Sequence, residues 1–344
     1  KNPGTYNDQL ATMSICLAMS AFNSNIGNDA EGGTDYTLKS KNVVKLMSDI
    51  GVARDDIYLS NTYTVKPKTD SIAVAIGQKS LNEEDGTILV PIAVRGAGYE
   101  SEWTSNVTIG NDTSKDLGEH AGFADAANKV FSQVQSYIEN YGLSQSVSKG
   151  KVKFWVTGYS RAGATANLTA RRLIDAYGNK NEIYAYCMEA PQGALKSNST
   201  EKYQSIHNCI NFTDPVPKVA PAYMDFTRYG TDQVFNQNTD KDTKKKVKAQ
   251  LQAVCDDISY NDYFTIGTID LFSSTVANMT LNAKWAMIHG VTQATDKAPQ
   301  NAGAFMDAFM DKFREWAIAD RAAFSTAPAD GSEQDLRENG SSLE

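Results

Sequence analysis

The sequence predicts an α/β fold in which a mostly parallel central sheet is flanked by helices. An apolar, strand-like run over residues 151–157 leads through a glycine-containing turn directly into a helix. Two more strand-like runs follow that helix at residues 182–188 and 205–212, an alternation typical of parallel sheets. The chain has 344 residues, of which 41% are hydrophobic, so it can bury a substantial core.

Two helices are expected before the sheet begins. Leu10, Met13 and Leu17 repeat at helical spacing within residues 6–22. A second helix begins at about residue 38 and ends at Gly51, because glycine is favoured just past a helix end. Together they form a helical N-terminal lead-in.

Three β-rich runs follow, at residues 57–65, 71–78 and 87–94. The Glu-Asp-Gly tripeptide at residues 84–86 is typical of a hairpin turn. Pro91 removes one ladder donor from the third run, so we expect that strand to split or bulge there.

The clearest helix covers residues 121–141, where apolar side chains fall on one stripe and Gly142 follows as a stop. Further helices are expected at residues 241–258, 268–287 and 304–324. The helix-rich second half therefore follows the last predicted strand.

No internal repeat or long linker divides the chain, so we predict one domain over residues 1–326. Within it, residues 238–285 form a helical insertion or cap. The final stretch, residues 327–344, is polar and contains glycine, and we expect a disordered tail.

A nucleophile elbow is the most informative motif, because its serine sits on a sharp strand-to-helix turn with the hydroxyl free to attack. The turn requires nearly side-chain-free residues two before and two after the serine. It consists of Gly158-Tyr159-Ser160-Arg161-Ala162-Gly163. Gly158 and Ala162 meet that demand, although Ala162 is looser than glycine. The alternative is a serine that merely caps a helix.

A serine nucleophile needs a base and an acid, and α/β-hydrolases place them in the order serine, acid, histidine. Of three histidines, only His207 and His289 follow Ser160. His207 would enter the sheet at the end away from the elbow, whereas His289 lies after a helix in a loop. We therefore favour His289 as the base and interpret His120, at a helix start, as structural.

The favoured acid is Asp214, which stands immediately beyond the strand that ends at residue 212. That position is the carboxyl edge of the sheet, where active sites of open α/β folds collect. An aspartate-proline turn with no catalytic part is the alternative. Asp225 and Asp232 are reserve acids.

Four separated motifs resemble those of the class 3 lipases, the fungal-type triacylglycerol lipases and their bacterial relatives. They are Val94-Arg95-Gly96-Ala97 with Trp103, His120-Ala121-Gly122-Phe123, the elbow Val156 to Ala164, and Asp214-Pro215-Val216-Pro217. The resemblance implies an α/β-hydrolase fold in which Ser160 is the nucleophile, Asp214 the acid and His289 the base. It also implies an oxyanion hole made by the backbone amides of Ala97 and Arg161.

The motifs depart from the family pattern at several positions. Ala97 stands where the family has serine or threonine, so the amide is kept and the side-chain hydroxyl is lost. Tyr159 and Arg161 replace histidine and leucine beside the serine, and Ala162 replaces glycine. These departures bear on lipid specificity more than on hydrolysis. Each hydrogen-bond donor of an oxyanion hole typically stabilises the transition state by about 2.7 to 4 kcal/mol.

Composition excludes some functions. A net charge of −8 does not supply the basic surface that nucleic-acid binding needs. The four cysteines show no metal-ligand spacing, and we predict neither a metal nor a cofactor. No run approaches 18 apolar residues, so no transmembrane segment is expected. The start at Lys1 is interpreted as removal of an export signal, which predicts a secreted or cell-surface protein.

The residues thus predict a carboxylic ester hydrolase that works through an acyl-enzyme and takes a small-molecule or lipid ester. Two alternatives stay open. In the first alternative the chain is a lipase-like binding protein with a disabled site. In the second it is a hydrolase of another acyl linkage. Acyl chain length and oligomeric state are not determined by the sequence.

Overall fold

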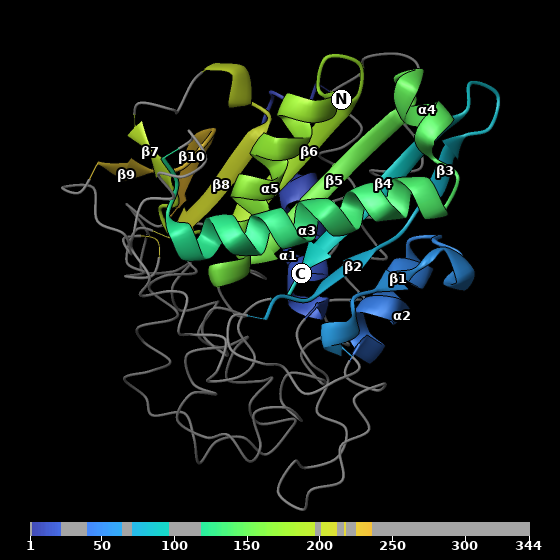
Figure 1. Cartoon of the computed structure of the whole chain (residues 1–344), viewed down its shortest axis with the longest axis horizontal. Coiled ribbons are helices and arrows are strands. Elements are labelled where there is room, and N and C mark those ends of the chain that lie inside the picture. The colour runs from blue at the N-terminus through green and yellow to red at the C-terminus, as the bar shows by residue number, and fades with distance from the viewer. Residues whose placement is uncertain are drawn as a thin grey trace, which may run out of the picture.

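The structure is a computed structural model that describes residues 2–21, 40–63, 71–95, 118–196, 201–211, 217 and 225–235. Its central sheet has the strand order β1-β2-β4-β5-β6-β8-β10, and β3 pairs with β4 outside that path (Figure 1). The strands are β1 (Tyr58–Leu59), β2 (Val74–Ile76), β3 (Lys79–Asn82), β4 (Thr87–Val94), β5 (Val152–Tyr159), β6 (Glu182–Met188), β8 (Ile206–Asn211) and β10 (Thr231–Phe235). A separate pair joins β7 (Ala194–Leu195) to β9 (Phe226–Thr227).

The centre of the sheet is parallel and one end is antiparallel. Strands β4, β5, β6, β8 and β10 run parallel to one another. Strands β1, β2 and β3 pair in the antiparallel sense. Parallel neighbours need crossover connections. Along the chain, the helices α3 (Ala121–Asn140) and α4 (Ser144–Ser148) come between β4 and β5, and α5 (Arg161–Tyr177) connects β5 to β6.

Helices cover both faces of the sheet, and each face has its own apolar cluster. The helices α1 (Asp8–Ser20) and α2 (Lys41–Asp49) pack on one face with Trp155 and Tyr186. The helices α3 and α5 pack on the other with Val156 and Ile183, in front of the sheet in Figure 1. The Trp155 indole N–H donates to Ser14 Oγ at 2.7 Å, which anchors α1 to β5. Both faces of the sheet are therefore buried under helices.

The predicted α/β class and the two N-terminal helices are confirmed. The expected split at Pro91 is wrong, because β4 is continuous and Pro91 pairs with Trp155. The Pro91 carbonyl accepts from the Gly77 N–H at 3.1 Å, and Gly77 lies in the gap between β2 and β3. The backbone N–H that proline lacks would face the same gap, so no hydrogen bond between paired strands is lost there.

Several predicted boundaries change. Within the described residues of the runs at 57–65 and 71–78, the strands are the short β1 and β2. The 3₁₀ turns η3 (Arg54–Asp56) and η4 (Asn61–Tyr63) flank β1. A third such turn, η9 (Glu201–Tyr203), precedes β8. The 84–86 turn joins β4 to β3, a strand the sequence did not indicate. The predicted helices beyond residue 240, the insertion 238–285 and the tail 327–344 lie outside the described residues.

Candidate active site

Ser160 occupies the turn between β5 and α5 in a conformation that few non-glycine residues adopt. Its φ is 59° and its ψ is −126°. The Ser160 N–H donates to the Met188 carbonyl on β6 at 2.9 Å, and its own carbonyl accepts from the Gly163 N–H at 2.8 Å. Strand, turn and helix thus hold a strained serine at the carboxyl edge of the sheet, as a nucleophile elbow requires.

The elbow is tight because backbone atoms approach each other where side chains would otherwise stand. A Cβ on Gly158 would lie 2.3 Å from the Ala162 carbonyl oxygen. A Cβ on Gly163 would lie 2.5 Å from the Met188 carbonyl oxygen. Ala162 is fully buried and its methyl group fits. Glycine is therefore required at positions 158 and 163, whereas position 162 tolerates one methyl.

Arg161 is the first residue of α5, so its amide is among those without an acceptor inside the helix. Such an amide, next to Ser160 at a helix N-terminus, is suited to a developing negative charge. The Arg161 side chain is 1% exposed and its Nη1 donates to the Ser71 carbonyl at 3.0 Å. That contact ties the elbow to the segment before β2.

Three predicted partners, Ala97, Asp214 and His289, lie outside the described residues. The described strands do end beside the elbow. Strand β4 ends at Val94 in register with Gly158, and β8 ends at Asn211, two residues after Cys209, the register partner of Met188. Strands β4 and β8 therefore end at the edge where Ser160 lies.

His207 is engaged elsewhere. It is the second residue of β8 and, through Tyr186, lies in register with Thr157, three residues before Ser160. Its Nε2 hydrogen-bonds with the Pro3 carbonyl at 2.9 Å, and burial lowers its pKa. This ring packs among the aromatic side chains on the α1 face, where Tyr6 meets it edge-on.

Both reserve acids are also held in other contacts. Asp232 accepts two hydrogen bonds from Arg228, at 3.0 and 2.6 Å, and one from Asn208. Asp225 is largely exposed and lies 3.7 Å from Lys196.

His120 precedes α3 and is completely buried. Its ring stacks on Phe123 with centroids 4.1 Å apart, and within the described part of the chain neither ring nitrogen has a hydrogen-bond partner. Burial lowers the pKa of His120 to about 4, so the ring is neutral at pH 7. Its surroundings are those of a packing residue.

The neighbouring Glu119 is 2% exposed and bridges α3 to α5 through two arginines. Its carboxylate lies 3.2 Å from Arg171 Nη2 and 2.7 Å from Arg172 Nη2. A buried carboxylate with two cationic partners fixes the relative position of the helices on this face.

Glu189 is a carboxyl group at this edge to which no motif pointed. It directly follows β6, is fully buried and has a φ of 47°. Its N–H donates to the Cys209 carbonyl at 2.9 Å. Because β6 is the neighbour of β5, Glu189 lies one strand away from the elbow. An acid immediately beyond a strand was the signal that singled out Asp214, and it applies equally to Glu189.

Among the residues that the structure describes, no group of three or more histidine, cysteine or acidic side chains is arranged to hold a metal. In the same residues, every helix is too short or too polar to cross a bilayer. The described cysteines, Cys16, Cys187 and Cys209, are buried, and no disulfide joins any two of them.

Residues 91–224 match the model of the family described as lipase (class 3). The matched segment contains Ala97, Ser160, Arg161 and Asp214, and it ends before His289. No curated protein matches the chain.

Solved lipase structures show a distant likeness. One is a Rhizomucor miehei lipase with its propeptide, 18% identical, covering 66% of this chain and 67% of that chain, with a TM-score of 0.42. Lipase II from Rhizopus niveus is 15% identical, covering 66% and 80%, with a TM-score of 0.45. A lipase from Rhizopus microsporus var. chinensis is 18% identical, covering 67% and 74%, with a TM-score of 0.43.

Proposed function

Through residues 91–224 the chain belongs to the class 3 lipase family of lipase-type ester hydrolases, and on that premise we propose that it cleaves carboxylic esters through an acyl-enzyme. Ser160 attacks the ester carbonyl and His289 takes the seryl proton, then returns it to the leaving alcohol. Asp214 orients His289 and stabilises its charged form. The amides of Ala97 and Arg161 hold the oxyanion.

The observation that carries this proposal is the strained backbone of Ser160 between β5 and α5, with φ 59° and ψ −126°. A serine that merely caps a helix has no need of this conformation, because a helix cap takes ordinary extended angles. The burial of Ala162 and the absence of side chains at Gly158 and Gly163 support the same interpretation.

The first experiment compares hydrolysis of p-nitrophenyl butanoate by the wild-type chain and by Ser160→Ala. We expect a loss of about 10⁴-fold or more in kcat, because the nucleophile is removed. Ser144→Ala, an exposed serine on α4, is the matched control and should keep the wild-type rate. Equal rates in wild type and Ser160→Ala would end the assignment.

The acid is tested by a second comparison. Asp214→Asn should lower kcat by about 10⁴-fold, because the base loses its orienting carboxylate. Glu189→Gln, which neutralises the other carboxyl at this edge, should lower it far less. The reverse order would assign the orienting role to Glu189.

A fluorophosphonate probe separates the enzyme from a binding protein with a disabled site. Labelling of wild type and not of Ser160→Ala supports the enzyme, and an unlabelled wild-type protein supports the binding protein. A panel of ester, amide and polysaccharide-linked acyl substrates then distinguishes hydrolysis of other linkages. Secretion or surface display belongs to the same proposal, and fractionation of the source organism's culture tests it.

A further inference from the structure

The side chain of Arg228 joins separate segments of the chain beside the elbow. Arg228 lies between β9 and β10, and its side chain is 11% exposed. Its Nη1 donates to the Pro217 carbonyl at 2.7 Å and to the Ala190 carbonyl at 3.0 Å. Ala190 comes after β6, which ends at Met188, and Pro217 comes after β8, which ends at Asn211. One guanidinium therefore holds together the segments that follow two neighbouring strands.

Asp232 fixes this guanidinium from its other side. The carboxylate accepts from Arg228 Nε at 3.0 Å and from Nη2 at 2.6 Å, a bidentate pair that sets the plane of the guanidinium. Asp232 also accepts from Asn208 Nδ2, on β8, at 3.1 Å. Asn208 is fully buried, and its Oδ1 accepts from Asn167 Nδ2, on α5, at 2.8 Å. Partners on β10, β8 and α5 thus set the direction in which Nη1 donates.

The Ala190 end of this contact lies against the elbow. The Ser160 N–H donates to the carbonyl of Met188, two residues before Ala190. A Cβ on Gly163 would lie 3.1 Å from Ala190 Cα, so the first turn of α5 packs directly on Ala190. Ala190 therefore has a fixed position relative to Ser160.

The Pro217 end restrains the segment that carries the proposed acid. Strand β8 ends at Asn211, which is paired with β10, and Arg228 holds the backbone again at Pro217. Asp214 lies three residues from each of these anchors. A chain extends by at most about 3.6 Å per residue, so each anchor keeps the Asp214 backbone within about 11 Å. Because Pro215 and Pro217 each have a fixed φ, a shift at the Pro217 anchor is carried toward Asp214.

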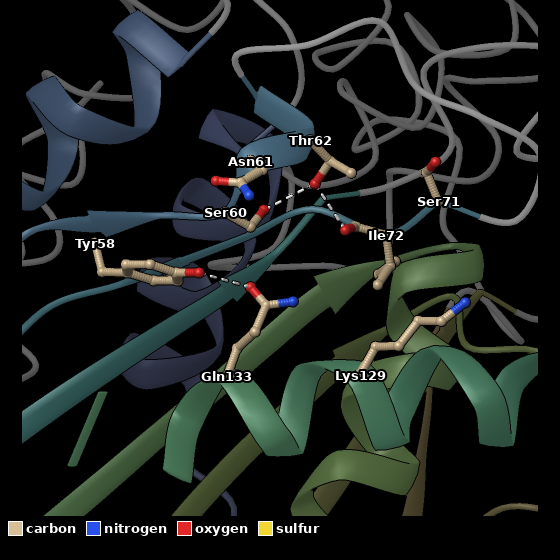
Figure 2. A pocket seen from close by; sticks show the side chains of 8 residues that line it. All are labelled: Tyr58, Ser60, Asn61, Thr62, Ser71, Ile72, Lys129 and Gln133. Carbon is tan, nitrogen blue, oxygen red and sulfur yellow. Dashed lines mark hydrogen bonds between the residues drawn. The ribbon is translucent and has the colours of Figure 1, made fainter. Parts of the chain in front are cut away.

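Arginine also braces the opposite side of the elbow through a backbone carbonyl. Arg161 Nη1 donates to the Ser71 carbonyl at 3.0 Å. On the same side, Figure 2 shows the Thr62 hydroxyl hydrogen-bonded to the Ile72 carbonyl, at 2.8 Å. These contacts tie the elbow to the β2 side of the sheet, whereas Arg228 ties it to the β8 side. The elbow is thus held on both sides, and Arg228 supplies contacts on the side of the proposed acid.

We propose that Arg228 is a positioning residue for Asp214, and that Asp232 acts with it by orienting the guanidinium. The proposal rests on the proposed ester hydrolysis, in which Asp214 orients His289. Arg228 sets the distance between the acid's segment and the elbow, so the carboxylate is in place before substrate binds. Lysine is a poor replacement, because an ammonium group lacks the rigid fork that pairs with a carboxylate and donates in fixed directions.

The first test compares kcat for p-nitrophenyl butanoate in Arg228→Met and Arg172→Met, per active site titrated with fluorophosphonate. Arg172 is the matched control: its side chain is 10% exposed, its Nη2 lies 2.7 Å from Glu119, and its Nη1 donates to the Leu168 carbonyl at 2.8 Å. We expect Arg228→Met to lower kcat by about 10- to 100-fold with little change in KM, the effect of displacing a catalytic group by up to about 1 Å. Arg172→Met should lower kcat by less than about 3-fold.

The pH profile separates positioning from a general loss of structure. A carboxylate beside an imidazole favours its charged form and so raises the pKa of the base. When Asp214 is displaced, the pKa of His289 falls, and the acid limb of kcat/KM in Arg228→Met should move to lower pH by about 0.5 to 1 pH unit. The loss of a positive charge by itself would move the limb to higher pH, because it favours the imidazolium. Arg172→Met should keep the wild-type limb.

Equal kcat values in Arg228→Met and Arg172→Met, or an acid limb that stays in place or moves to higher pH, would overturn the proposal. Arg228→Lys keeps the charge and should recover less than about 3-fold of the lost kcat. Wild-type kcat in Arg228→Lys would also overturn it, because charge would then suffice. Asp232→Asn should lower kcat by about 3- to 10-fold, and wild-type kcat in this variant would remove Asp232 from the proposal.

Amide hydrogen exchange separates this proposal from the proposed function. Exchange in the segment between Asn211 and Pro217 should become about 5- to 10-fold faster in Arg228→Met, because the anchor at Pro217 is lost. It should stay at the wild-type rate in Arg172→Met. Faster exchange in Arg228→Met with no ester hydrolysis by wild type would reject the proposed function and keep the anchor. Wild-type exchange and hydrolysis in Arg228→Met would reject the positioning role alone.

Discussion

Replacing Gly163 by alanine should damage the elbow more than one methyl group ordinarily would. The new Cβ would lie 2.5 Å from the Met188 carbonyl oxygen and 3.1 Å from Ala190 Cα. Carbon atoms in contact stay about 3.5 to 4.0 Å apart, and both neighbours are backbone, so no side chain can rotate away. Either α5 or the end of β6 has to move.

The cost follows from the contacts that would break. Overpacking of this kind costs about 1 to 3 kcal/mol. Met188 O accepts the hydrogen bond from the Ser160 N–H, and its loss costs about 0.5 to 1.5 kcal/mol. Alanine in place of glycine in a helix returns up to about 1 kcal/mol. We expect a net loss of about 0.5 to 4.5 kcal/mol in the free energy of unfolding. If Ser160 is displaced by about 1 Å, kcat should fall about 100-fold.

Urea unfolding measures the first effect, and ester hydrolysis per active site titrated with fluorophosphonate measures the second. Gly193→Ala is the matched control, because its Cβ would meet only side-chain carbons at 3.5 Å or more. It should change stability by less than about 0.5 kcal/mol. Wild-type stability and activity in Gly163→Ala would refute the backbone contact, and reduced stability with full activity would refute its role in positioning Ser160.

Three further outcomes are expected. Glu119→Gln should lower the free energy of unfolding in urea by about 3 kcal/mol, because it leaves the buried Arg172 without its carboxylate and Arg171 with Asp175 alone; a loss below about 0.5 kcal/mol would contradict the burial. The pKa of His120 is about 4 in the folded chain and 6.5 in the unfolded chain, so between these pH values the unfolded chain binds one more proton than the folded chain. The free energy of unfolding therefore falls as the pH drops below about 6.5, by at most about 3 kcal/mol at pH 4. His120→Phe should flatten this part of the stability curve, and identical curves would argue against a buried neutral ring. Ser14→Ala should cost about 1 to 3 kcal/mol and shift tryptophan fluorescence, since the Trp155 indole loses its partner; an unchanged spectrum would count against that bond.

Much of the fold could be predicted from local patterns. The stripe over residues 121–141 predicts α3, and the run at 182–188 coincides with β6, because periodicity and burial act on neighbouring residues. The elbow could be predicted for a similar reason, because a tight turn restricts the size of the side chains at a few consecutive positions of the sequence. The sequence did not predict that β4 continues through Pro91. That outcome depends on the position of Pro91 opposite the gap between the end of β2 and the start of β3, which only strand pairing defines.

The candidate site divides in the same way. Ser160 and the small residues around it follow from the sequence, because the elbow is a local structure made by six consecutive residues. The contact of Arg161 with Ser71, 90 positions away, and the place of Glu189 beside the elbow follow only from the order and register of the strands. By itself the sequence determined the α/β class and the nucleophile motif. Only the tertiary structure decided what surrounds the serine, because strand pairing joins residues that no local pattern relates.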